Sequence, residues 1–203
     1  MQLIIISPPA EYPHEPRMVH RILQQSAVTL HLRKPGCETR ALAAYLARIP
    51  TDLHGRIMVH GHPGLLDRFG LRGIHFTQRQ RNANPQAIRQ IRRAWPAVRI
   101  SSAFHRLADI PTAGPFDYVF LSPIFDSISK PGYRAAFTHV ELRRFLTATG
   151  QRVVALGGID AQHIDAAADL GFDDVAVLGA VWSGDNPVKA ALDLAAACKR
   201  ITS

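Results

Sequence analysis

The chain has 203 residues, of which 47% are hydrophobic and 20% are charged, and its formal net charge is +8. This composition excludes a disordered chain, and no apolar run approaches the roughly 20 residues that a membrane helix requires. The apolar start of the chain is too short, and lacks the basic segment, for a signal peptide. The two isolated cysteines, Cys37 and Cys198, form no disulfide framework. We therefore expect a cytoplasmic protein that neither spans nor binds a membrane.

Short runs of β-branched residues alternate with amphipathic helical stretches along the whole sequence. The predicted strands are residues 3–7, 29–33, 56–60, 73–76, 98–102, 118–122, 153–156 and 174–178. The predicted helices are residues 15–26, 38–49, 62–69, 85–95, 105–111, 138–148, 161–170 and 187–201. Asn-Pro pairs at 84–85 and 186–187 are typical of helix starts.

Eight strand–helix units with short connections predict an α/β fold, a closed (βα)8 TIM barrel that forms a single domain over residues 1–203. An open, doubly wound sheet is the alternative. That fold normally has a glycine-rich turn after its first strand, whereas this chain has Ser7-Pro8-Pro9 there.

Functional groups of such barrels come from the carboxyl ends of the strands and from the loops that follow them. The sequence places polar, basic and glycine residues at these points: His31, Arg33, Lys34, His60, Gly61, His62, His75, Thr77, Gln78, Ser101, Ser102, His105, the segment 122–130, Gly157, Gly158 and Gly179. Asp126 is almost alone among them as a carboxylate. The sequence therefore predicts a site for small anionic ligands. Nucleic acid is disfavoured, because Arg89, Arg92 and Arg93 lie at helical spacing opposite Ile88, Ile91 and Trp95, which indicates a solvated helix face and not a surface with interleaved stacking aromatics.

Two groups of residues suggest separate anion pockets. Gly157, Gly158 and Gly179 follow the last two predicted strands, where this fold commonly binds phosphate, although glycines also simply permit tight turns. Ser127, Ser129 and Lys130 follow the sixth strand and offer hydroxyls and an ammonium to a pyrophosphate.

The second predicted strand, residues 29–33, carries two further candidate residues. His31 and Arg33 share one side of that strand because side chains alternate with a period of two. If that side is the barrel interior, both side chains point toward the mouth, and we favour ligand contact for Arg33 over a structural ion pair.

Five segments together resemble the thiamine phosphate synthase/TenI family. They are His-Leu-Arg-Lys at 31–34, Gly-Ile-His-Phe-Thr-Gln at 73–78, Ser-Pro-Ile-Phe-Asp-Ser-Ile-Ser-Lys at 122–130, Ala-Leu-Gly-Gly-Ile at 155–159 and Val-Ala-Val-Leu-Gly-Ala-Val at 175–181. The segments span nearly the whole chain in the order of the family.

The resemblance implies an enzyme that joins a hydroxymethylpyrimidine diphosphate to a thiazole phosphate and releases pyrophosphate. It implies catalytic roles for Arg33 and Lys130, to which we add His31 and His75 as candidates for acid–base chemistry. The expected substrate-binding residues are Lys34, His60, Gln78, His105, Ser127, Ser129, Gly157, Gly158 and Gly179. It also implies small phosphorylated substrates and a homodimer.

The chain departs from the family at the positions that bind Mg2+. The Asn-Asp pair after strand three is His60-Gly61 here, and the second aspartate, after strand four, is Gln80. Mg2+ is thus possible by resemblance, but its usual carboxylates are missing and we name no metal ligand. Protonated histidines at the mouth are one possible replacement for its charge, and a zinc site is another, although no ligand spacing is diagnostic.

These departures leave three functions open. The first is a thiamine phosphate synthase. The second is a TenI-like tautomerase of a thiazole carboxylate phosphate, although the histidine which that branch uses is Pro123 here. The third is a non-catalytic binder of thiazole phosphate, which the missing carboxylates favour.

Overall fold

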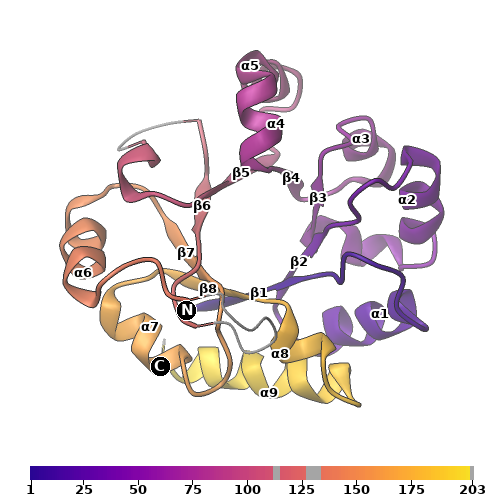
Figure 1. Ribbon diagram of the computed structural model, residues 1–203. Coiled ribbons are helices and arrows are strands. Elements are labelled where there is room, and N and C mark those ends of the chain that lie inside the picture. The colour runs from indigo at the N-terminus through magenta and orange to yellow at the C-terminus, as the bar shows by residue number, and fades with distance from the viewer. Residues whose placement is uncertain (112–114, 127–133, 202–203) are drawn as a thin grey trace.

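The computed structural model describes residues 1–111, 115–126 and 134–201. Eight parallel strands close into a barrel in which each strand pairs with the next along the chain and β8 pairs with β1 (Figure 1). The strands are β1 (Gln2–Ile6), β2 (Thr29–Leu32), β3 (Ile57–His60), β4 (Gly73–Phe76), β5 (Arg99–Phe104), β6 (Tyr118–Leu121), β7 (Val153–Leu156) and β8 (Asp174–Val177). The predicted barrel is confirmed, and every strand begins and ends within two residues of its expected bounds.

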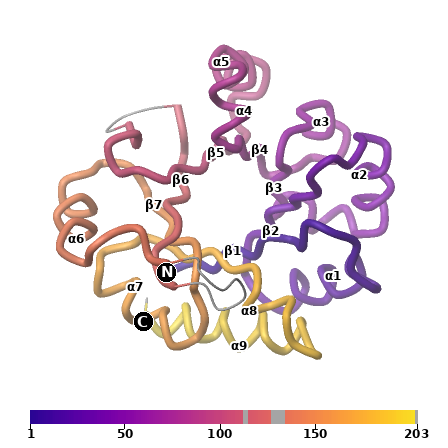
Figure 2. The backbone as a smooth tube through the Cα atoms, in the orientation of Figure 1, coloured from indigo at the N-terminus to yellow at the C-terminus, as the bar shows by residue number. Residues whose placement is uncertain are grey.

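The helices lie on the outside of this barrel (Figure 2). They are α1 (Glu15–Gln25), α2 (Thr39–Leu46), α3 (Leu65–Phe69), α4 (Gln78–Ala83), α5 (Pro85–Ala94), α6 (His139–Ala148), α7 (Ile164–Leu170), α8 (Gly179–Trp182) and α9 (Pro187–Arg200), with 3-10 turns η1 (Thr51–Arg56) and η2 (Leu107–Asp109). Asn84 and Asn186 cap α5 and α9 as expected, because their side chains accept hydrogen bonds from the N–H groups of Ala87 and Lys189. Among the described helices, none has the length and apolar character needed to cross a membrane.

The predicted helices need correction at three places, one of which is the short helix α8, which was not expected. The expected helix at 105–111 is only the short turn η2, because Pro111 cannot donate the N–H that a longer helix requires. Conversely, α4 was not expected. Its start is a capping box, in which Thr77 accepts from the Gln80 N–H while the Gln80 side chain accepts from the Thr77 N–H.

The barrel interior is a separate core from the layer between strands and helices. Its apolar part comes from alternate positions of five strands: Ile4, Ile6, Met58, Tyr118, Phe120, Val154 and Ala176. His31 and His75 share this interior, because their rings lie 4.8 Å and 4.9 Å from the ring of Phe120. β2 and β4 therefore place polar side chains where barrels usually carry branched apolar ones.

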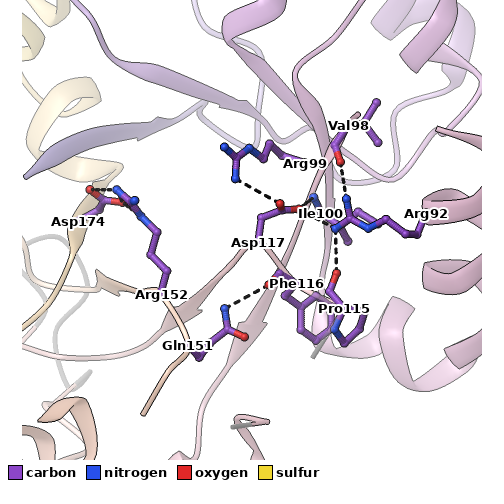
Figure 3. A network of polar contacts seen from close by, with 10 residues as sticks. All are labelled: Arg92, Val98, Arg99, Ile100, Pro115, Phe116, Asp117, Gln151, Arg152 and Asp174. Carbon is purple, nitrogen blue, oxygen red and sulfur yellow. Dashed lines mark hydrogen bonds and ion pairs between the residues drawn. The ribbon is translucent and has the colours of Figure 1, made fainter. Parts of the chain in front are cut away.

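Ion pairs hold together the strand ends at the opposite, amino-terminal face of the barrel (Figure 3). Asp117 accepts hydrogen bonds from Arg92, Arg99 and the N–H of Ile100. Burial alone would raise the pKa of Asp117, but these hydrogen bonds and the arginine charges outweigh burial and hold the pKa below its ordinary value. Because functional groups of this fold lie at the other face, we assign this network to stability.

Candidate functional site

Three histidines from neighbouring strands meet inside the barrel. His31 Nδ1 lies 3.1 Å from His60 Nε2, and the rings of His60 and His75 stack with their centroids 4.3 Å apart. On the far side, His31 Nε2 lies 2.7 Å from the Tyr118 hydroxyl, and His75 Nδ1 lies 2.8 Å from the Ser101 hydroxyl. The strand register produces this meeting, since His60 pairs with His75 and His75 pairs with Ser101 across β3, β4 and β5.

Burial makes all three imidazoles hard to protonate. The pKa values of His31 and His60 lie well below the ordinary value, mainly because burial disfavours the charged ring and then because the neighbouring histidines repel a second charge. Burial, followed by the charges of Arg33 and Arg81, lowers the pKa of His75 to about 3. The idea that these histidines replace Mg2+ as cations is therefore wrong for this cluster: they are neutral near pH 7.

The expected gathering of five histidines at the mouth is also corrected. His31 is 0% exposed and His75 is 2% exposed, so both lie inside the barrel and not in its opening. His105 is exposed and lies 2.9 Å from the carbonyl oxygen of Ser122, while His62 pairs with the Thr39 hydroxyl. Three of the five histidines thus form a cluster, and the other two do not join it.

Arg33 and Lys34 are neighbours in sequence but have opposite environments. Arg33 lies close enough to His60 and His75 for its charge to lower the pKa of both. Within the described chain, its guanidinium has no hydrogen bond and no ion pair, which leaves it available to an anion.

Lys34, in contrast, is fully occupied. Its ammonium lies 2.5 Å from the Glu15 carboxylate and donates to the carbonyl oxygens of Pro8 and Ala10. An ammonium has three donors, and all three are used here. The expected substrate contact of Lys34 is therefore wrong, and its role is to fix the loop after β1.

The glycines after β7 are required by the fold itself. Gly157 and Gly158 have φ values of 95° and 68°, which disfavour other residues. A Cβ on Gly157 would lie 2.9 Å from Cα of Pro123, and one on Gly158 would lie 2.4 Å from the carbonyl oxygen of Asp126. The beginning of the loop after β6 thus packs directly onto this pair. The glycines are therefore needed for contact with another part of the same chain, whether or not they also contact a ligand.

We expect Gly158→Ala to lower the free energy of unfolding by about 2 kcal/mol, since a left-handed backbone and contact with main-chain atoms both oppose the added methyl group. Urea unfolding followed by circular dichroism measures the change. Gly184→Ala is the matched control, because a Cβ there would meet no atom within 4 Å, and its stability should equal that of the parent. Equal stabilities of the two variants would contradict the packing described above.

The remaining predicted residues divide between described and undescribed parts of the chain. Gln78 begins α4 at the end of β4 and is half-buried, and Gly179 begins α8 after β8. Ser127, Ser129 and Lys130 lie outside the described residues, so the expected pyrophosphate pocket stays a prediction.

Sequence reasoning missed Tyr118 as a partner of His31, and it did not connect Ser101 with His75. The signal was present. Both residues occupy inward positions of β6 and β5, as the alternation from Phe120 and Ala103 shows, and a polar residue at such a position requires a polar partner.

Comparison with known proteins gives consistent results. The family model described as "Thiamine monophosphate synthase" matches residues 3–181. A thiamine-phosphate synthase of Chromobacterium violaceum is 32% identical over 156 residues, which cover 75% of this chain and 72% of that protein. The thiamine-phosphate synthase of Halorhodospira halophila is 32% identical over 159 residues, which cover 78% of this chain and 69% of that protein.

Solved structures agree with the sequence comparisons. Thiamine phosphate pyrophosphorylase from Bacteroides thetaiotaomicron superposes with a TM-score of 0.77 at 28% identity, over 100% of this chain and 98% of that chain. The enzyme of the same name from Pyrococcus furiosus has a TM-score of 0.81 at 19% identity, over 100% of this chain and 97% of that chain, which shows a common fold.

Proposed function

We propose that this chain, which belongs to the thiamine monophosphate synthase family, joins a hydroxymethylpyrimidine diphosphate to a thiazole phosphate and releases pyrophosphate. The observation that carries the proposal is the Arg33 guanidinium, which has no partner among the described residues and whose charge acts on His60 of β3 and His75 of β4, in a chain that matches the family over residues 3–181. Relatives of 32% identity bear the name of this activity, which supports a transferase of thiamine biosynthesis.

The reaction requires stabilisation of the negative charge that develops on the departing diphosphate. The bond between the pyrimidine methylene carbon and the diphosphate oxygen breaks, the electron pair leaves with pyrophosphate, and the thiazole nitrogen then donates its pair to the cationic methylene. Arg33 can bind the oxygens of the departing group with two parallel N–H donors, which stabilises the charge as it develops. His31 and His75 are 0% and 2% exposed, so the barrel interior beside Arg33 has a low dielectric constant, which strengthens this interaction.

The residues of this chain do not fit the Mg2+ that the family resemblance implies. Positions 61 and 80, which correspond to the two carboxylates, do face each other: a Cβ on Gly61 would lie 2.8 Å from Nε2 of Gln80. Gly61 has no side chain. Gln80 presents its amide nitrogen, because its amide oxygen accepts hydrogen bonds from the N–H and the hydroxyl of Thr77. Mg2+ requires oxygen ligands, so we assign no step to it.

A non-catalytic binder of thiazole phosphate is the second candidate, because the same two positions lack the carboxylates. The tautomerase is less well supported. Its histidine position is Pro123, and His31 and His75 are 0% and 2% exposed, which keeps both away from a substrate in the mouth. Small phosphorylated substrates are common to all three functions, and the homodimer and the cytoplasmic location remain predictions.

A direct assay separates these functions. Purified protein is incubated with both substrates, with and without Mg2+, and thiamine phosphate is measured by chromatography against a sample without protein. We expect product above this background. Binding of thiazole phosphate without product would instead indicate the binder, and conversion of the thiazole carboxylate tautomer would indicate the isomerase.

A further inference from the structure

The three-histidine cluster of β2, β3 and β4 has the geometry of a metal site. One ring nitrogen from each of His31, His60 and His75 lies within 4.8 Å of the other two. The closest pair is 3.1 Å apart, and two nitrogens bound to one tetrahedral zinc ion at about 2.0–2.1 Å would be separated by roughly 3.3 Å. Small side-chain movements would bring the nitrogens into position.

The hydrogen bonds behind the cluster orient the rings. If His31 donates from Nε2 to Tyr118 and His75 donates from Nδ1 to Ser101, the other nitrogen of each ring carries a lone pair, and that of His31 lies against His60 Nε2. Histidines that bind metals typically donate their second N–H to such an outer partner. Two of the three rings therefore have the support that a metal site requires.

The hydrogen bonding within the cluster is incomplete. A single proton can lie between His31 Nδ1 and His60 Nε2, and whichever ring donates it, the buried Nδ1 of His60 has no hydrogen-bond partner in the part of the chain that the structure describes. Buried polar atoms without partners are rare in folded proteins. A cation bound to His31 Nδ1 and His60 Nε2 would take the place of the shared proton.

We propose that His31, His60 and His75 bind one divalent transition-metal ion, Zn2+, inside the barrel. Imidazole nitrogens suit Zn2+ and its neighbours in the first transition row, whereas Mg2+ requires oxygens. Three protein ligands leave one coordination position open. The nearby charge of Arg33 opposes a bound cation, so an anion in the mouth would favour binding.

Metal titration tests this proposal independently of turnover. Protein freed of metal with a chelator is titrated with Zn2+ in competition with a chromophoric chelator, and separately with Co2+ while visible absorption is recorded. We expect one equivalent of Zn2+ and a Co2+ spectrum of low-coordinate, nitrogen-bound type. Failure of the parent protein to take up Zn2+ and to give this spectrum would overturn the proposal, and the cluster would then be a hydrogen-bonded part of the core.

Variants locate the site. His60→Asn removes a ligand and should weaken Zn2+ binding by more than about 100-fold, while Ser101→Ala keeps every ligand and should weaken it by about tenfold through loss of ring orientation. His139→Gln removes an exposed histidine of α6 and should bind like the parent. Unchanged affinity in a folded His60→Asn protein would overturn the proposal. If that variant fails to fold, Ser101→Ala decides in its place, and parent-like affinity there counts against the site.

Discussion

Replacing Arg33 with glutamine is expected to lower the rate of thiamine phosphate formation by about 100-fold, the effect of losing one strong donor to a developing negative charge. The expectation rests on what the guanidinium does not do in the fold. It forms no hydrogen bond or ion pair with any described residue, yet its charge acts on His60 and His75. A cation without a partner among the described residues is available to substrate anions and contributes little to folding.

The measurement compares kcat/KM of the parent and of Arg33→Gln for both substrates, together with the urea midpoint of each protein. Arg79→Gln is the matched control, because Arg79 is an exposed arginine of α4, and its kinetics should be those of the parent. A folded Arg33→Gln enzyme with parent-like kcat/KM would show that the guanidinium does not contact the leaving group.

Much of the fold was predictable because its signals are local. Alternation along each strand follows from backbone geometry, and the Asn-Pro helix starts depend on residues only three positions apart. The same alternation put His31 and Arg33 on one side of β2 without deciding which side faces inward, and the structure shows His31 against the interior residue Phe120. Even α4 was locally encoded, since Thr77 and Gln80 have the spacing of a capping box, but the search for apolar periodicity passed over a helix with no buried residue.

The candidate site was harder to predict because its contacts are distant in sequence. The hydrogen bond between His31 and Tyr118 joins residues 87 positions apart, and it exists only because the barrel closes. Depth within the barrel was equally hidden. A strand pattern indicates which face a histidine occupies, but only the stagger of the strands places His75 below the mouth.

The glycine pair shows how one sequence pattern supports two explanations. Gly157 and Gly158 were expected to admit a phosphate, and the structure shows that they admit the backbone of residues 123–126. Both explanations require the same left-handed backbone, so the residue type alone does not separate them. The two explanations are separated by which atoms lie where a Cβ would be, those of a ligand or those of the chain.

Lys34→Gln is expected to lower the stability of the protein, whereas Arg33→Gln is expected to lower its activity. The difference arises because the Lys34 ammonium is already bound within the fold. The variant leaves the Glu15 carboxylate, which is 2% exposed, without its cation. Breaking a buried pair in this way costs about 3 kcal/mol of unfolding free energy. Urea unfolding at pH 7 measures this loss, and we expect no specific effect on phosphate affinity in the protein that remains folded.

The pH dependence of this loss identifies its cause. Burial raises the pKa of Glu15 even in the parent, although hydrogen bonds from Lys34 and Tyr45 partly offset it. Without Lys34 the folded-state pKa rises further above the unfolded value, so the variant loses stability as pH increases through that interval. The deficit relative to the parent should therefore be small near pH 4 and full at pH 7. The double variant Glu15→Gln, Lys34→Gln removes the unpaired charge and should recover part of the stability at pH 7. A double variant no more stable than Lys34→Gln would show that the ammonium acts mainly through Pro8 and Ala10.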